Sequence, residues 1–242
     1  MVKNVFIVEF IGLPGVGKST VSHRVAALLS QRGISVNEPS NVELFKYRKY
    51  KRIIRKGIFI AREVIFHPKG VWLSARIIIS TKQRSIKDLI KVFLNWVYVS
   101  SMRKSCIEVY GVHLFDQGIF QALWSIGFGA MAVDFLSLVK ILFNSLEVPH
   151  VVVVLNANQD TIKKRLTKRT ICHSRLEKWY LDDGQIILKA SALLNNIKKA
   201  IDLLSIENEN ISIIVIDNDR DDYIERRALE ITNFLEKIVI NS

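Results

Sequence analysis

A short apolar run followed directly by a glycine-rich stretch constrains the fold of this 242-residue chain more than any other feature. The run Val5–Ile11 is rich in β-branched residues, which predicts a buried strand. After the glycines, apolar residues recur at helical spacing over residues 19–31, until Gly33 stops the helix. The chain therefore predicts a strand, a tight loop and a helix in direct succession.

The loop between this strand and helix matches the pattern G-x-x-x-x-G-K-[ST], which binds nucleotide phosphates. Glycines let backbone N–H groups curve around phosphate oxygens, and the helix N-terminus adds a positive dipole end. We expect Lys18 to reach the β- and γ-phosphates and Ser19 to bind Mg²⁺. A glycine turn that binds nothing is the less favoured alternative, because both flanks fit. The expected nucleotide-binding residues are Gly12, Leu13, Pro14, Gly15, Val16, Gly17, Lys18, Ser19 and Thr20.

Strand-like and helix-like segments alternate along the rest of the chain. Apolar runs predict strands at residues 34–37, 112–115, 148–155 and 211–216, and helical spacing predicts helices at 159–170, 185–204 and 223–238. This alternation indicates an α/β fold with a parallel sheet and helices on both faces, and we expect one domain over residues 1–242. Polar residues interrupt the apolar stretch 119–142, which is therefore interpreted as a buried helix rather than a bilayer span.

Acidic residues follow two of the predicted strands. Asp116 ends the strand at residues 112–115, where phosphate-loop proteins place a carboxylate that binds Mg²⁺ or positions the acceptor. Glu38 follows the second strand and could hold an acceptor hydroxyl, act as a base or contact the metal through water. A turn residue is the alternative for Asp116, and a solvated loop acid is an equally weighted alternative for Glu38.

Basic residues cluster in two places. Arg165, Arg169 and Arg175 lie on and just after the helix at 159–170, where guanidinium groups could stabilise a transferring phosphoryl group. Residues 46–104 hold 16 Lys and Arg against two acids, so this segment carries the whole excess of the chain's net charge of +12. We interpret residues 46–105 as a basic helical insertion within the domain.

The insertion contains a helix with two different faces. An apolar stripe predicts packing on the body of the protein, against a second stripe over residues 86–97. The opposite face is basic but also carries Phe59 and Phe66. Solubility, an anionic membrane surface and nucleic acid all stay open as explanations of that basic face. The members of the stripe are Tyr50, Ile53, Ile54, Gly57, Ile58, Ala61, Val64 and Ile65.

These pieces stand in an order that resembles the P-loop nucleoside and nucleotide kinases, nearest to the thymidylate kinase-like branch. The resemblance implies a five-stranded parallel sheet in the order 2-3-1-4-5 and a lid at about residues 165–177. Under it Arg165, Arg169 and Arg175 would be lid residues, and Asp116 would lie at the acceptor and metal end. Thymidylate kinases usually have Asp-Arg where this chain has Asp116-Gln117, and that arginine holds the phosphate of the acceptor.

The expectation from the sequence is a phosphotransferase that uses ATP and Mg²⁺ and transfers the γ-phosphoryl group to a small acceptor. Nucleoside monophosphates, nucleosides and other small molecules all stay open as acceptors, and a homodimer stays open as an assembly. The alternative is an NTP-binding regulatory module that docks on a membrane or nucleic acid through residues 46–104. Two cysteines and the absence of a signal-peptide pattern favour the cytoplasm, with peripheral membrane attachment left open.

Overall fold

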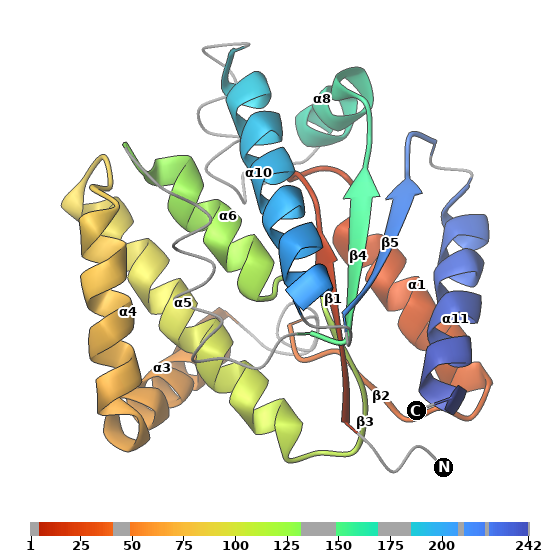
Figure 1. Cartoon of the computed structure of the whole chain (residues 1–242), viewed down its shortest axis with the longest axis horizontal. Coiled ribbons are helices and arrows are strands. Elements are labelled where there is room, and N and C mark those ends of the chain that lie inside the picture. Colours follow the sequence, from red (N-terminus) through yellow and green to blue (C-terminus); the bar gives the residue numbers. More distant parts are fainter. Residues whose placement is uncertain are drawn as a thin grey trace.

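The computed structural model describes residues 5–40, 49–131, 149–168, 185–207, 211–220 and 223–241. A five-stranded sheet forms its centre, with the strands in the order β2-β3-β1-β4-β5 and every pairing parallel (Figure 1). The predicted α/β fold and its strand order are confirmed. The strands are β1 (Val5–Ile11), β2 (Val36–Asn37), β3 (Gly111–Phe115), β4 (Val151–Asn156) and β5 (Ser212–Asp217).

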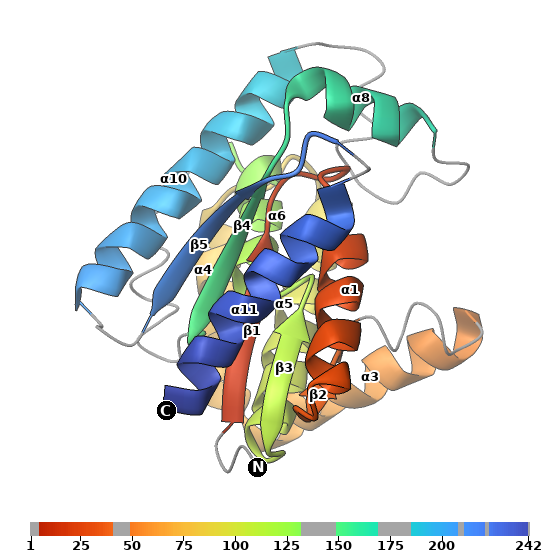
Figure 2. The same cartoon turned by 90° about the vertical axis from the view of Figure 1, so that its right-hand side faces the viewer.

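Helices cover both faces of the sheet and bury its side chains in two apolar clusters (Figure 2). One cluster joins alternate residues of β1, such as Phe6 and Val8, to helices α1 and α11. The other joins Ile7 and Ile11 to the helices of the opposite face. This alternation follows from the pleat, which turns successive side chains to opposite faces of a strand. The helices are α1 (Lys18–Gln31), α3 (Lys49–Phe66), α4 (Pro68–Ser80), α5 (Ile86–Ile107), α6 (Ile119–Gly129), α8 (Gln159–Thr167), α10 (Gln185–Glu207) and α11 (Ile224–Asn241).

Most predicted elements agree with the structure to within a few residues, but the long apolar helix does not. The helix α6 ends at Gly129, and Ala130 has extended backbone and forms an isolated bridge with Gln83. The helix predicted over residues 119–142 is therefore confirmed as far as Gly129 and interrupted at Ala130. Residues 132–142 lie outside the described part of the chain.

The predicted basic insertion is helical, because α3, α4 and α5 follow one another between β2 and β3. Its orientation is the reverse of the prediction. The side of α3 that contacts α5 carries Phe59 and Glu63, whereas isoleucines of the predicted packing stripe are exposed. The expected partner stripe on α5 is also only partly buried, with Ile86 and Ile90 exposed. The ion pair of Glu63 with Lys104 holds α3 in this orientation.

No helix in the described ranges combines the length and the apolar character needed to cross a membrane.

Candidate active site

The loop between β1 and α1 has a backbone that side chains would obstruct. Gly12, Gly15 and Gly17 have φ values of 156°, 90° and 99°, a region that glycine enters without strain. A Cβ on Gly12 would lie 2.5 Å from the carbonyl oxygen of Leu155, and one on Gly17 would lie 2.7 Å from the side chain of Asn218. The glycines that the motif requires are therefore required here by both conformation and space.

Buried side chains fix this loop to both faces of the sheet. Leu13 is packed into the cluster that contains α5 and α6, and Val16 into the cluster that contains α1 and α11. Pro14 and Gly17 are half-buried, and Thr20, in the first turn of α1, is exposed. Packing on both faces therefore fixes the curvature of the loop, as a preformed phosphate cradle requires.

Lys18 is the first residue of α1, and its side chain folds back over the loop. Its Nζ donates hydrogen bonds to the carbonyl oxygens of Gly12 at 2.8 Å and Leu13 at 3.1 Å. The ammonium group therefore lies at the positive end of the helix dipole, where an anion is also attracted.

Ser19 and Asp116 meet although 97 positions separate them in the chain. The hydroxyl of Ser19 donates a hydrogen bond to Oδ2 of Asp116, which follows β3, the neighbour of β1 in the sheet. Asp116 is 1% exposed, and its Oδ1 is buried without a hydrogen-bond partner. A hydroxyl beside a carboxylate with an unused oxygen is a donor set that suits Mg²⁺.

Glu38 follows β2, which is the next strand beyond β3. Its Oε2 lies 2.9 Å from Nδ1 of His23 on α1, and its side chain is 14% exposed. Two residues later, the hydroxyl of Ser40 accepts a hydrogen bond from the backbone N–H of Asp116 at 3.3 Å. The segments after β2 and β3 are thus joined, and both acidic residues lie at the same edge of the sheet.

Arg165 on α8 reaches the phosphate loop from the opposite side of β1. Its Nη1 donates hydrogen bonds to the carbonyl oxygens of Val16 at 3.3 Å and Asn218 at 2.9 Å. The buried side chain of Asn218 itself donates from Nδ2 to Val16 at 2.8 Å. Arg165 therefore connects α8, the loop and the segment after β5, while Arg169 and Arg175 lie outside the described residues.

A carboxylate that the sequence reasoning did not single out lies beneath these groups. Glu9 on β1 is fully buried, and its Oε1 accepts hydrogen bonds from the backbone N–H groups of Phe120 and Gln121 at the start of α6. Burial raises the pKa of Glu9 to about 7, although the nearby Arg103 and the α6 amides act in the opposite direction. A Cβ on Gly118 would lie 2.3 Å from Cδ of Glu9, so this carboxylate sets the path of the turn after Asp116.

The structure thus brings together Lys18, Ser19, Asp116 and Arg165 around one loop, with Glu38 on the adjoining segment. Sequence reasoning missed Glu9, Ser40 and Asn218. The signal for Glu9 was present, because it is the one charged residue in an otherwise apolar strand. No comparable local signal marks Ser40 or Asn218, which act through contacts with distant segments.

Comparisons with known proteins give a distant structural likeness and no sequence match. No family model matches the chain, and no curated protein matches it either. Among solved structures, the chain is similar to a thymidylate kinase from Ehrlichia chaffeensis, with a TM-score of 0.48 and 13% identity. The alignment covers 96% of this chain and 99% of that one. A likeness of this size says nothing about substrate.

Proposed function

We propose that this protein is an ATP- and Mg²⁺-dependent phosphotransferase that moves the γ-phosphoryl group of ATP to a small acceptor. The observation that carries the proposal is the contact between Ser19 and Asp116 at the end of a preformed glycine loop. A loop that only turned the chain would need neither the buried carboxylate nor its unused Oδ1.

Each group at the loop has a distinct part in this proposal. The loop amides and Lys18 bind the phosphates, because they place positive partial and full charge at the N-terminus of α1. Ser19 and Asp116 would hold Mg²⁺, which neutralises charge that develops on the phosphoryl oxygens. Glu38 lies on the segment joined to Asp116 and is the candidate to orient or deprotonate an acceptor hydroxyl.

Arg165, with Arg169 and Arg175, is proposed to act on the phosphate side of the site. The guanidinium of Arg165 is already held by two carbonyl oxygens, so it fixes the position of the loop as well as adding charge. Such a group can act without a large rearrangement, which is the property that electrostatic catalysis requires.

The acceptor is proposed to be a nucleotide, a nucleoside or another small hydroxyl compound. Gln117 is exposed beside Asp116, and an amide offers an acceptor phosphate no positive charge. Acceptors without a phosphate, or with a phosphate bound elsewhere, are therefore favoured over dTMP. In this respect the proposal departs from a simple thymidylate kinase.

The test is a screen of the purified full chain with radiolabelled ATP and Mg²⁺ against nucleosides, nucleoside monophosphates and sugars. We expect label to reach one class of acceptor and to stay on ATP in the Asp116→Asn variant. The matched control is Asp202→Asn, which neutralises an exposed carboxylate on α10. ATP turnover that needs no acceptor but rises with vesicles or nucleic acid would instead support a regulatory NTPase.

A further inference from the structure

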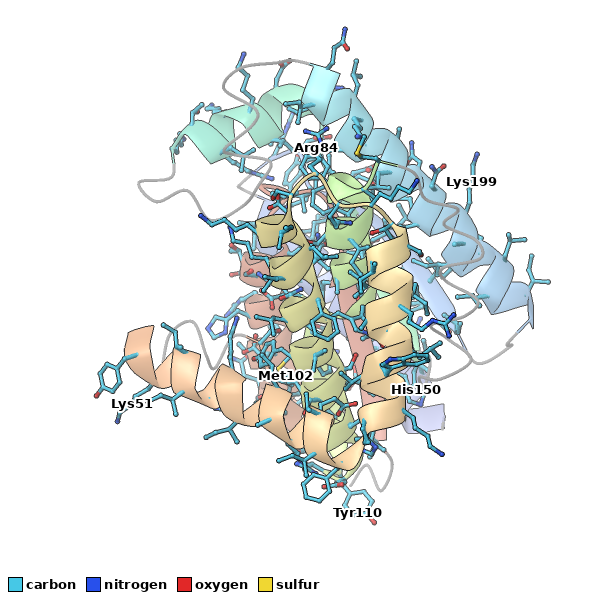
Figure 3. All side chains as sticks on the ribbon, turned by 90° about the vertical axis from the view of Figure 1, so that its left-hand side faces the viewer. Lys51, Arg84, Met102, Tyr110, His150 and Lys199 are labelled. Atoms are coloured by element: carbon cyan, nitrogen blue, oxygen red, sulfur yellow. The ribbon has the colours of Figure 1, made fainter. Side chains whose placement is uncertain are left out.

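Helix α3 presents an apolar stripe to solvent along its whole length. The side chains of this stripe, apart from Gly57 and Ala61, are 46–69% exposed, and those two small residues are exposed as well. Figure 3 shows α3 crossing the lower part of this face, with Lys51 at its outer end and Tyr110 below its other end. Here the α3 stripe means Tyr50, Ile53, Ile54, Gly57, Ile58, Ala61, Val64 and Ile65.

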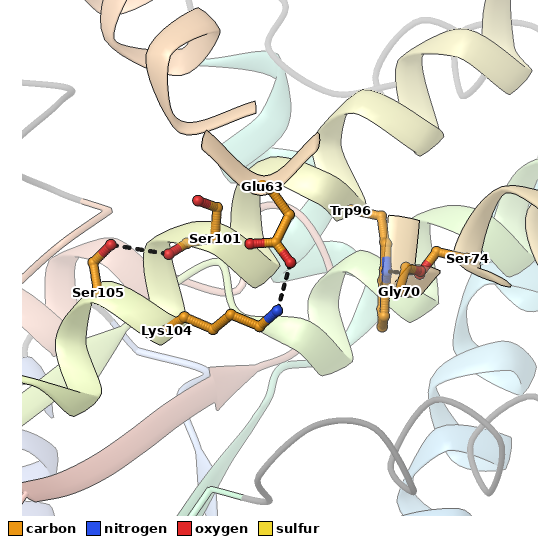
Figure 4. Close-up of polar contacts among 7 residues, drawn as sticks. All are labelled: Glu63, Gly70, Ser74, Trp96, Ser101, Lys104 and Ser105. Atoms are coloured by element: carbon orange, nitrogen blue, oxygen red, sulfur yellow. Dashed lines mark hydrogen bonds and ion pairs between the residues drawn. The ribbon is translucent and has the colours of Figure 1, made fainter. Parts of the chain in front are cut away.

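The opposite face of α3 is firmly attached to the body of the protein, so the stripe cannot simply turn inward. Glu63 is 5% exposed and forms a 2.6 Å ion pair with Lys104 of α5 (Figure 4). Phe59 packs edge-on against Tyr98, with ring centroids 5.8 Å apart. Turning the stripe toward α5 would expose Phe59 and break this buried ion pair, a costly change.

Cations border one side of the stripe. At 100° per residue, Lys51 and Arg62 lie along this border, and Arg62 also contacts Ser105 and Glu108 near the end of α5. Lys56 is turned toward α5, where its Nζ lies 4.8 Å from the centre of the Tyr98 ring. The only acid in α3 is the buried Glu63, so the exposed surface of this helix bears positive charge alone. An exposed aliphatic stripe on a helix whose exposed charges are all Lys and Arg is the pattern of a helix that lies in the interface of an anionic membrane.

We propose that α3 docks this protein on an anionic phospholipid surface through the α3 stripe. The isoleucines would enter the boundary between headgroups and acyl chains, while Lys51 and Arg62 on the border of the stripe reach the lipid phosphates. Figures 1 and 2 place α3 toward the amino-terminal ends of the strands, whereas the phosphate loop follows the carboxyl end of β1. Docking therefore leaves the candidate active site open to solvent.

Charge and side-chain chemistry favour a lipid surface over a second copy of this chain and over single-stranded nucleic acid. A second copy of α3 packed stripe to stripe would bring positive charges of the two copies together. Single-stranded nucleic acid needs aromatic side chains for base stacking, but the middle of the stripe is aliphatic and Phe59 is turned toward Tyr98. Neither difficulty arises with acidic phospholipid.

The experiment is sedimentation of the full chain with vesicles of phosphatidylcholine alone or mixed with phosphatidylserine, at low and at raised salt. One variant combines Ile54→Ser with Ile58→Ser, and its matched control combines Leu203→Ser with Ile206→Ser, which removes exposed apolar side chains from α10. All four positions are solvent-exposed, so neither variant should lose its fold, and circular dichroism and Tm check this.

We expect the wild type and the α10 control to bind phosphatidylserine vesicles far better than neutral ones, and salt to weaken binding. The α3 variant should bind at least about tenfold more weakly, since two aliphatic side chains no longer enter the lipid. No binding at low salt, or equal binding by both variants, would overturn the proposal. A dimer detected by sedimentation velocity that the α3 substitutions dissociate would also overturn it. Oligonucleotide binding that these substitutions abolish, together with no binding to vesicles, would do the same.

Discussion

Oε2 of Glu9 lies 3.8 Å from Nη1 of Arg103, and both side chains are almost completely buried. The pair joins β1, at the centre of the sheet, to α5, the last helix of the basic insertion. Because the other oxygen of Glu9 accepts from the first amides of α6, one carboxylate holds α5, α6 and the turn after Asp116 together.

The raised pKa of Glu9 predicts a pH dependence of stability. The folded protein keeps the proton up to a pH of about 7, whereas the unfolded chain releases it near 4.5. Stability from this group is therefore greatest at low pH, falls as the pH rises toward 7 and is level above it. Glu9→Gln lacks this titration. In urea unfolding, the free energy of unfolding of the variant should therefore rise relative to that of the wild type from about pH 5 to about pH 7. Parallel stability curves would show that Arg103 keeps Glu9 ionised throughout.

Removal of the Lys18 ammonium group should abolish phosphoryl transfer. Lys18→Ala leaves the loop's glycines and packing in place but removes the charge that faces the phosphates, so we expect a fall in turnover of roughly 10²-fold or more. Thermal unfolding should change little, because the hydrogen bonds of this side chain to Gly12 and Leu13 stay within the loop and anchor no other element. Lys163→Ala, which removes an exposed lysine from α8, is the control. An active Lys18→Ala enzyme would exclude the phosphate-loop assignment.

Asp116→Asn should separate metal binding from ATP binding. The amide keeps the size of the side chain and can still accept from Ser19, but it loses the charge that Mg²⁺ requires. We expect a large loss of turnover with a modest loss of ATP affinity, measured over a full Mg²⁺ titration. Normal turnover at every Mg²⁺ concentration would reduce Asp116 to a turn residue.

Arg165→Lys tests whether this side chain fixes the loop. Lysine cannot bond the carbonyls of Val16 and Asn218 with the geometry of a guanidinium group. We expect turnover to fall more than ATP affinity, and Tm to fall slightly, since hydrogen bonds from a charged donor contribute about 1 kcal/mol or more. Loss of turnover with an unchanged Tm would point to an action on the transferring phosphoryl group alone.

Gln117 predicts that dTMP is a poor acceptor. With an amide at position 117 in place of an arginine, an acceptor that already carries a phosphate loses one partner, and Gln117→Arg should improve the use of dTMP relative to acceptors without phosphate. Initial rates with each acceptor measure the effect. Wild-type turnover of dTMP within the usual enzyme range, roughly 1–10³ per second, would contradict the inference.

The phosphate loop was predictable because its chemistry is local. Nine consecutive residues, Gly12 to Thr20, must supply the curvature, the amides, the lysine and the hydroxyl, so their spacing is visible in the sequence. Asp116 was found for a related reason, since a parallel sheet brings the carboxyl ends of its strands to one edge. The strand order came from the resemblance to P-loop kinases, because apolar runs do not say which strands pair.

The orientation of α3 could not be predicted in the same way. Its sequence defines an apolar side and a basic side, but the side that packs depends on Tyr98 and Lys104, which lie about forty positions away on α5. Burial of Phe59 and Glu63 against these two partners outweighs the apolar stripe. Asn218 is a parallel case, because its bond to Val16 spans 202 positions of the chain.

The close approach of Gly118 to Glu9 links two positions that are 109 residues apart. Any larger residue at 118 would need a shorter side chain at 9, and a shorter side chain at 9 would leave Arg103 and the α6 amides without their buried acceptor. Neither position can change alone without cost. Among relatives of this protein, Glu at 9 and Gly at 118 should therefore be kept together or replaced together.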